Sequence, residues 1–96
     1  MPETITRPAE IDFERLMGFI PPWRVILHND DHNSMDHVVV SLMGSIPQLT
    51  IERAAEIMLA AHNDGQASVI VCPKEHAELY RDRLEGCGLT ATIEPD

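Results

Sequence analysis

The chain alternates short, mostly apolar runs with longer segments in which apolar residues recur every three or four positions. The short runs lie at residues 23–27, 66–72 and 89–93. Their length, their β-branched residues and the glycines and prolines near them are typical of strands. The longer segments have the spacing of amphipathic helices, so the pattern predicts strands separated by helices.

Helix-capping residues mark where the first two helices begin and end. Asn33 is expected to cap the first helix, with Asp36 forming a variant capping box, and this helix should run to about Gly44. Thr50 should cap the second helix. Gly65 should end it, because glycine readily adopts the left-handed conformation of a helix terminus.

The third helix completes the predicted topology. Pro73 fits its first helical position, and Gly86 should close it. The crossover through this helix makes the second and third strands parallel, and the first strand, the most continuously apolar, fits between them in antiparallel orientation. We therefore predict an α+β fold of order βααβαβ, in which a three-stranded antiparallel sheet is backed by three helices.

The beginning of the chain differs from the rest. Residues 1–20 are expected to form a flexible N-terminal extension, because their first half has no apolar period. From Ile11 the apolar side chains are spaced as on one face of a short helix, so this part either stays disordered, docks loosely or folds onto a partner. Pro21 and Pro22 end the segment, and one domain is expected over residues 21–96.

Charge and composition narrow the partners. The 96 residues carry 16 acidic and 7 basic side chains, a net charge of -9 at pH 7. This charge repels nucleic-acid phosphates and anionic lipid, so we expect neither as a partner, and it suits a cationic group such as a peptide amine. The apolar runs are too short to span a membrane and the N-terminus does not resemble a signal peptide, so we expect the protein in the cytoplasm or a stroma-like compartment. From its composition we expect a monomer.

Residues 28–37, between the first strand and the first helix, are the most polar stretch, and we expect the functional site there. A calcium loop starting at its first aspartate would need glycine and glutamate where the chain has Met35 and Ser41. A zinc site would need convergent ligands, whereas Asp36 and His37 leave a helix in different directions. We therefore expect no metal or other cofactor.

Other reactive groups give no sign of catalysis. Cys72 and Cys87 form neither a CxxC pair nor a zinc spacing, so both are expected to be reduced thiols. The sequence has no GxSxG motif, no Cys/His pair in a recognisable context and no glycine-rich phosphate loop. We expect a binding protein that is not an enzyme.

The second helix carries a histidine at the end of an apolar stripe. Helical spacing relates Ile51, Ala54, Ala55, Met58 and His62. Taken alone, a histidine in such a place is more often a core residue than one that binds a ligand. Its meaning depends on the pattern of which it is part.

Two separated motifs together resemble the ClpS adaptor family. The first is Asn29-Asp30-Asp31 after an apolar strand, followed by Met35 and Val38-Val39. The second is Glu52-Arg53-Ala54-Ala55, followed by Met58-Leu59, His62 and Gly65. The resemblance covers Pro21 to about Glu94 and implies an adaptor with no catalysis of its own. Such an adaptor binds the N-terminal residue of substrate proteins and delivers them to a Clp-family AAA+ unfoldase, of the ClpA or ClpC type, and its protease.

The resemblance also implies roles for the polar residues. Asn29 and His62 would hold the α-amino group of the substrate, with Asp30 nearby as a charge and Asp31 fixing the start of the peptide backbone. An ammonium group has three donors, so His62 must present an unprotonated nitrogen.

The apolar side chain of the first residue would enter a pocket formed by Leu27, Met35, Val38, Met58, Ala61 and Leu89. By the same resemblance, Met35 would exclude β-branched first residues, whose χ1 is stiff. The family commonly has an apolar residue, a threonine and a valine where this chain has His28, Asn33 and Ala61. We therefore predict that Phe or Tyr is preferred over Leu as first residue.

Two residues of the third helix concern the partner. Glu75 corresponds to a surface through which the family contacts its unfoldase, and Tyr80 stands where some members have lysine. The alternative is a docking domain of the same βααβαβ order, similar to the C-terminal domain of the ribosomal stalk protein, which would recruit translation factors through a basic helix face. The net charge of -9 argues against that alternative.

Overall fold

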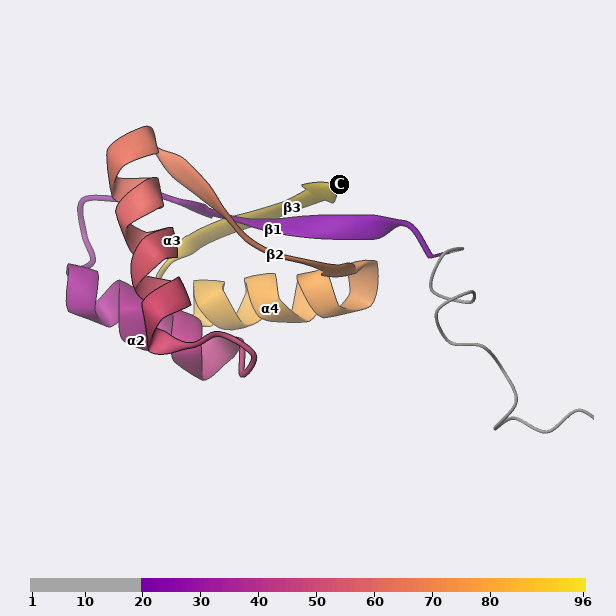
Figure 1. Cartoon of the computed structure of the whole chain (residues 1–96), viewed down its shortest axis with the longest axis horizontal. Coiled ribbons are helices and arrows are strands. Elements are labelled where there is room, and N and C mark those ends of the chain that lie inside the picture. The colour runs from indigo at the N-terminus through magenta and orange to yellow at the C-terminus, as the bar shows by residue number, and fades with distance from the viewer. Residues whose placement is uncertain (1–19) are drawn as a thin grey trace, which may run out of the picture.

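The computed structural model describes residues 20–96. Its elements follow the predicted order βααβαβ (Figure 1). They are β1 (Pro22–His28), α2 (Met35–Ser45), α3 (Ile51–Asp64), β2 (Gln66–Pro73), α4 (Lys74–Gly86) and β3 (Thr90–Pro95). The predicted extension and the possible helix from Ile11 fall almost wholly outside the described residues.

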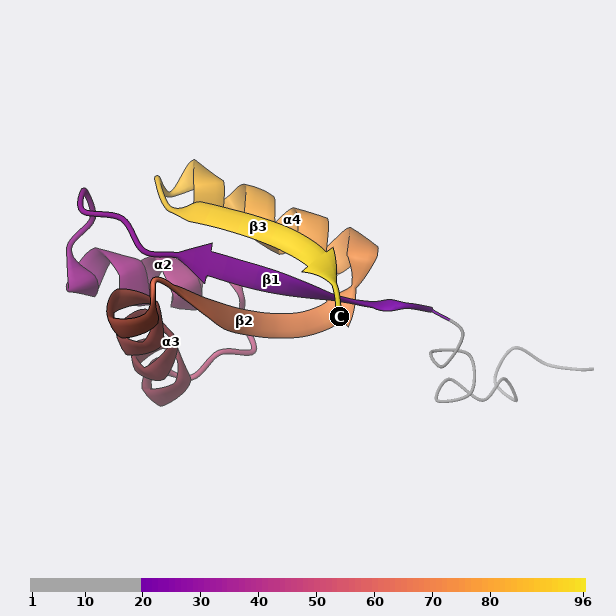
Figure 2. The same ribbon diagram turned by 90° about the horizontal axis from the view of Figure 1, so that it is seen from above.

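The sheet has the predicted order, with β1 between its neighbours. The strands are arranged β2-β1-β3, and β1 is antiparallel to both β2 and β3. Viewed from above, the strands lie in front of α2 and α4, while α3 lies beside β2 (Figure 2). The α+β prediction is thereby confirmed, and the strand order agrees with the apolar character of β1, whose Val25, Ile26 and Leu27 are all buried.

Each helix contributes one line of buried side chains to the core. These lines are Leu42 with Ile46 at the end of α2, Ala54, Ile57 and Ala61 on α3, and Ala77, Tyr80 and Leu84 on α4. The predicted stripe on α3 was therefore partly wrong, because Ile51 is 57% exposed and the buried line runs through Ile57. His62 lies at the exposed border of this line.

The helix ends confirm some predicted caps and correct others. Thr50 Oγ1 accepts a hydrogen bond from Arg53 N (3.1 Å), and Gly65 ends α3 in the left-handed conformation with φ 91°. The prediction that Asn33 caps α2 was wrong, because Ser34 Oγ accepts from His37 N (3.1 Å) instead.

Strand pairing moved the predicted start of α4 by one residue. Pro73 is the cap and Lys74 the first helical residue, because Pro73 still pairs with Pro22 across the sheet. Cys72, half-buried in β2, and Cys87, exposed after α4, are free thiols. Within residues 20–96, none of the helices combines the length and apolar content needed to cross a bilayer.

Candidate functional site

A cavity of about 320 Å³ opens where β1 ends, beside the start of α2 and the second half of α3. Its lining residues are Leu27, His28, Asn29, Asp30, Asp31, Asn33, Ser34, Met35, Val38, Met58, Ala61 and His62. The wall contains buried Leu27 and Ala61, while Asn29, Asp31 and His62 are exposed. The cavity thus combines an apolar interior with a polar border.

The structure brings together nearly all the residues predicted for this site. The exception is Leu89, which is 4% exposed within the core and does not line the cavity. Ser34 lines the cavity but was not predicted. Its place just before an apolar helical pattern, where serine is a favoured cap, was a signal that could have drawn attention to it.

The rim segment, residues 29–34, is stabilised internally by Asp30. Its Oδ1 accepts hydrogen bonds from the backbone N–H groups of His32 (2.8 Å) and Asn33 (2.9 Å), and both carboxylate oxygens accept from Asn33 Nδ2 (3.1 and 3.0 Å). Burial by itself raises the pKa of Asp30, but the hydrogen bonds from Asn33 and His32 outweigh it and lower the pKa below its usual value. Asp30 therefore stabilises the rim as a carboxylate.

Two glycine turns anchor the rim segment. Asn29 N donates to the Gly65 carbonyl (2.9 Å) after α3, and Asn33 Nδ2 donates to the Gly88 carbonyl (2.9 Å) before β3. Gly65 and Gly88 both have positive φ, 91° and 89°, which a side chain would disfavour. These two hydrogen bonds thereby attach the rim segment to the turns that follow α3 and α4.

Three polar side chains at the cavity remain unused by the fold. Among the hydrogen bonds within residues 20–96, none involves the side chains of Asn29, Asp31 or His62. The amide oxygen, the carboxylate and a neutral imidazole nitrogen are all hydrogen-bond acceptors. His62 lies in the last turn of α3, just before the Gly65 turn that anchors Asn29, and all three acceptors line the same cavity.

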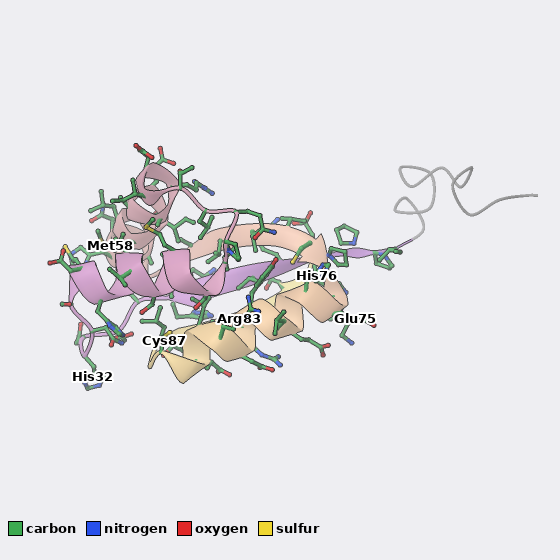
Figure 3. All side chains as sticks on the ribbon, turned by 90° about the horizontal axis from the view of Figure 1, so that it is seen from below. His32, Met58, Glu75, His76, Arg83 and Cys87 are labelled. Atoms are coloured by element: carbon green, nitrogen blue, oxygen red, sulfur yellow. The ribbon has the colours of Figure 1, made fainter. Side chains whose placement is uncertain are left out.

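His28 and His32, near the rim, do not add to this set of free acceptors. His28 Nε2 lies 2.7 Å from Thr92 Oγ1 of β3. His32 points outward from the rim (Figure 3) and does not line the cavity. In the part of the chain that the structure describes, no three His, Cys, Asp or Glu side chains are grouped so that they could hold a metal ion.

The start of α4 lies at the other end of the molecule from the cavity. Glu75 is exposed there, beside Lys74, whose ammonium lies 4.8 Å from the ring centroid of Trp23. Figure 3 shows Glu75 and His76 far along α4 from Cys87. Tyr80 is only 7% exposed, and its hydroxyl accepts from Gln48 Nε2 (2.9 Å). Glu75 is therefore accessible to solvent, whereas Tyr80 belongs to the core.

Comparison with known proteins agrees with this architecture. Residues 20–92 match the family described as ATP-dependent Clp protease adaptor protein ClpS. The chain is 51% identical over 77 residues to the ATP-dependent Clp protease adapter protein ClpS of Gloeobacter violaceus, covering 80% of this chain and 83% of the relative. It is 44% identical over 90 residues to the chloroplastic adapter CLPS1 of Arabidopsis thaliana, covering 94% and 57%.

A solved structure shares the fold. Agrobacterium tumefaciens ClpS2 bound to L-phenylalaninamide superposes with a TM-score of 0.75 at 28% identity, covering 79% of this chain and 98% of that one. Fold and relatives together define a protease adaptor, a protein without catalysis of its own. The chain belongs to the ClpS family, whose named members here come from bacteria and chloroplasts.

Proposed function

We propose that the cavity binds the free N-terminal amine and the bulky apolar first side chain of substrate proteins, and that the chain delivers these proteins to a Clp AAA+ unfoldase and its protease. The observation that carries this proposal is the set of three unused acceptors, Asn29, Asp31 and His62, at the border of an apolar cavity. Neither the acceptors nor the apolar cavity would by itself select an N-terminal residue.

The acceptors suit an ammonium group. A free α-amino group has a pKa of about 7.7 to 8.0, so it is mostly protonated at neutral pH and offers three donors. Asn29 and a neutral His62 would accept two of them, and Asp31 would supply charge and fix the start of the backbone. Asp30 contributes its charge from within the rim, because its oxygens are already occupied by His32 and Asn33.

The apolar interior suits the first side chain. Leu27, Val38, Met58 and Ala61 line it, and the two methionines of the cavity can adjust to side chains of different shape. L-phenylalaninamide, the ligand of the Agrobacterium relative, has a free amine and an aromatic side chain. A substrate with Phe at its first position would present the same two groups to this cavity.

A peptide-binding assay tests the proposal. We expect the full chain to bind a labelled peptide that begins with Phe, and to lose binding when the N-terminus is acetylated, because acetylation removes the charge and leaves the acceptors unpaired. A peptide with Gly as first residue is the control for the apolar interior. Equal affinity for free and acetylated peptides would overturn the proposal.

Delivery is the second half of the proposal. Glu75 is exposed in the first turn of α4, away from the cavity, so a bound substrate leaves it free for an unfoldase of the ClpA or ClpC type. We expect a monomer that acts in the cytoplasm or a plastid stroma. Glu75→Ala should slow degradation of a substrate by a Clp unfoldase and its protease, while peptide binding is kept. Glu85→Ala, near the other end of α4, is the matched control, and equal effects of the two would count against this surface.

A further inference from the structure

The two anchors of the rim segment differ in kind. At Asn29 the bond to Gly65 joins backbone to backbone, so no side-chain substitution removes it. At the other end the bond to Gly88 comes from the side chain of Asn33. Residues 29–34 contain no helix or strand, so their position depends on such individual bonds.

Asn33 is fully committed as a donor. One amide nitrogen serves the Asp30 carboxylate inside the rim and the Gly88 carbonyl outside it, 55 residues away. It therefore joins the internal turn of the rim to the connection between α4 and β3. Asn33 lines the cavity, but both of its donor hydrogens are directed to the protein rather than to a ligand.

His37 makes a second bond to the same connection. Its Nε2 lies 2.7 Å from the carbonyl oxygen of Cys87, which immediately precedes Gly88, so this nitrogen carries the proton and donates. The backbone N–H of His37 at the same time donates to the capping Ser34 at the end of the rim. The neighbouring carbonyls of Cys87 and Gly88 thus accept hydrogen bonds from His37 and Asn33, which lie on either side of Ser34 in the chain.

His37 can influence the proposed binding site only indirectly. It does not line the 320 Å³ cavity, and it lies instead in a second cavity between α2 and α4. Any effect of His37 on the binding of a first residue must therefore pass through the rim or α2. This makes it a cleaner probe than Asn33, which lines the cavity itself.

From these contacts we infer that Asn33 and His37 are positioning residues, which latch the rim of the binding site to the connection between α4 and β3 at Cys87 and Gly88. This inference rests on the proposed function for its effect on substrate, but the latch itself is a property of the unliganded chain. With the latch closed, Asn29 and Asp31 are held beside His62 before a ligand arrives. Without it, binding has to order the rim as well, which lowers affinity.

Substitutions in the full 96-residue chain test the latch. Asn33→Ala and His37→Ala should each weaken binding of a free peptide beginning with Phe by roughly 5-fold, the worth of about one net hydrogen bond, mainly through faster dissociation. His37→Gln keeps a side-chain donor and should restore part of the affinity. His32→Ala, on the same rim but pointing outward, is the matched control and should bind as the unchanged protein does.

Hydrogen exchange without peptide separates this test from that of the proposed function. The rim amides of His32 and Asn33 should exchange faster in both alanine variants, while the amide of Leu42 in α2 keeps its protection. If His37→Ala left both rim exchange and affinity unchanged, the latch would be wrong. If Asn33→Ala weakened binding without freeing the rim, Asn33 would be a direct ligand contact, and the inference would also fail. A third outcome is that neither the unchanged chain nor any variant binds free peptides, while rim exchange still becomes faster in the two alanine variants. In that case the proposed function would fail and the latch would stand.

Discussion

Two cavities among residues 20–96 differ in size and in their polar groups, and the larger one has fewer free polar side chains. The cavity between α2 and α4 measures about 570 Å³, against about 320 Å³ at the rim. In the larger one the polar groups are bonded to the protein itself: His37 donates to the Cys87 carbonyl, and Arg83 Nη1 donates to the Ser45 carbonyl (3.0 Å). In the smaller cavity, the side chains of Asn29, Asp31 and His62 make no such bond within residues 20–96.

The difference identifies the property on which the proposed binding site rests. A bonded donor or acceptor contributes little to a ligand, because it would have to break one hydrogen bond to make another. An unused acceptor beside an apolar wall offers both orientation and hydrophobic burial. Volume alone would have pointed to the larger cavity rather than to the one that we propose as the binding site.

The largest expected effect comes from removing an unused acceptor. Asn29→Ala or His62→Ala should weaken binding of a free peptide beginning with Phe by at least about 10-fold, because a hydrogen bond to a charged group is worth roughly 1.5 to 3 kcal/mol. Arg83→Gln in the larger cavity should leave the affinity unchanged. Fluorescence anisotropy with one labelled peptide measures all three, and equal losses in the two cavities would break the comparison.

Widening the entrance of the smaller cavity should change its selectivity. Met35 lines the cavity and is 46% exposed, so we expect a first side chain to enter beside it. Met35→Ala should raise the affinity for peptides beginning with Ile or Val several-fold, because their stiff χ1 prevents them from turning away from the methionine. Affinities for Ile, Val and Phe peptides check this. If Ile and Val bind no better than before, the entrance lies elsewhere.

Narrowing the interior should act in the opposite sense. Ala61 is 3% exposed and lines the cavity, and we expect the space beside it to favour Phe or Tyr over Leu. Ala61→Val adds two carbons, worth up to roughly 0.8 kcal/mol each in apolar contact, and should shift preference toward Leu by a few-fold. Competition between Phe and Leu peptides measures the ratio, with a thermal melt to confirm folding. If the unchanged chain bound the Leu peptide more tightly than the Phe peptide, the expectation would be contradicted.

A substitution in the larger cavity should alter stability alone. Gly44 lies in α2, and a Cβ added there would meet no heavy atom within 4 Å. Gly44→Ala should raise the free energy of unfolding by roughly 0.5 to 1 kcal/mol, the usual gain from replacing a helical glycine. Urea denaturation measures the gain. Peptide affinity should not change, and a clear loss of affinity would show that the two cavities are coupled at this point.

The smallest expected effect is the loss of stability at low pH through protonation of Asp30. The folded-state pKa of Asp30 lies below its ordinary value of 3.8, so the carboxylate stabilises the fold above that value, and this contribution is lost as pH falls through the folded pKa. Asp30→Asn should therefore be less stable than the unchanged chain at pH 7, and the difference should shrink at acidic pH. Denaturation at both pH values checks this. A difference that stayed constant would mean that the charge of Asp30 has no part in holding the rim.

The sequence by itself determined the elements and the neighbourhood of the site. Apolar spacing predicted the three strands and three helices, and Thr50 and Gly65 were found as caps because each acts on backbone groups within a few residues. The Asn29-Asp30-Asp31 motif and His62 were assigned to the site through the resemblance to the ClpS family, and they follow or belong to elements, β1 and α3, that the apolar pattern predicts.

Tertiary structure decided which polar groups were left free. Asn33 was predicted to cap α2, but its side chain donates to the Gly88 carbonyl, 55 residues later in the chain. The cap of α2 is Ser34 instead. Tyr80 and Leu89, which the resemblance assigned to a partner surface and to the cavity, are both buried in the core of the folded chain. Local periodicity carries no information about a partner so far along the chain, and that is why only the folded molecule distinguishes the bonded Asn33 from the free Asn29.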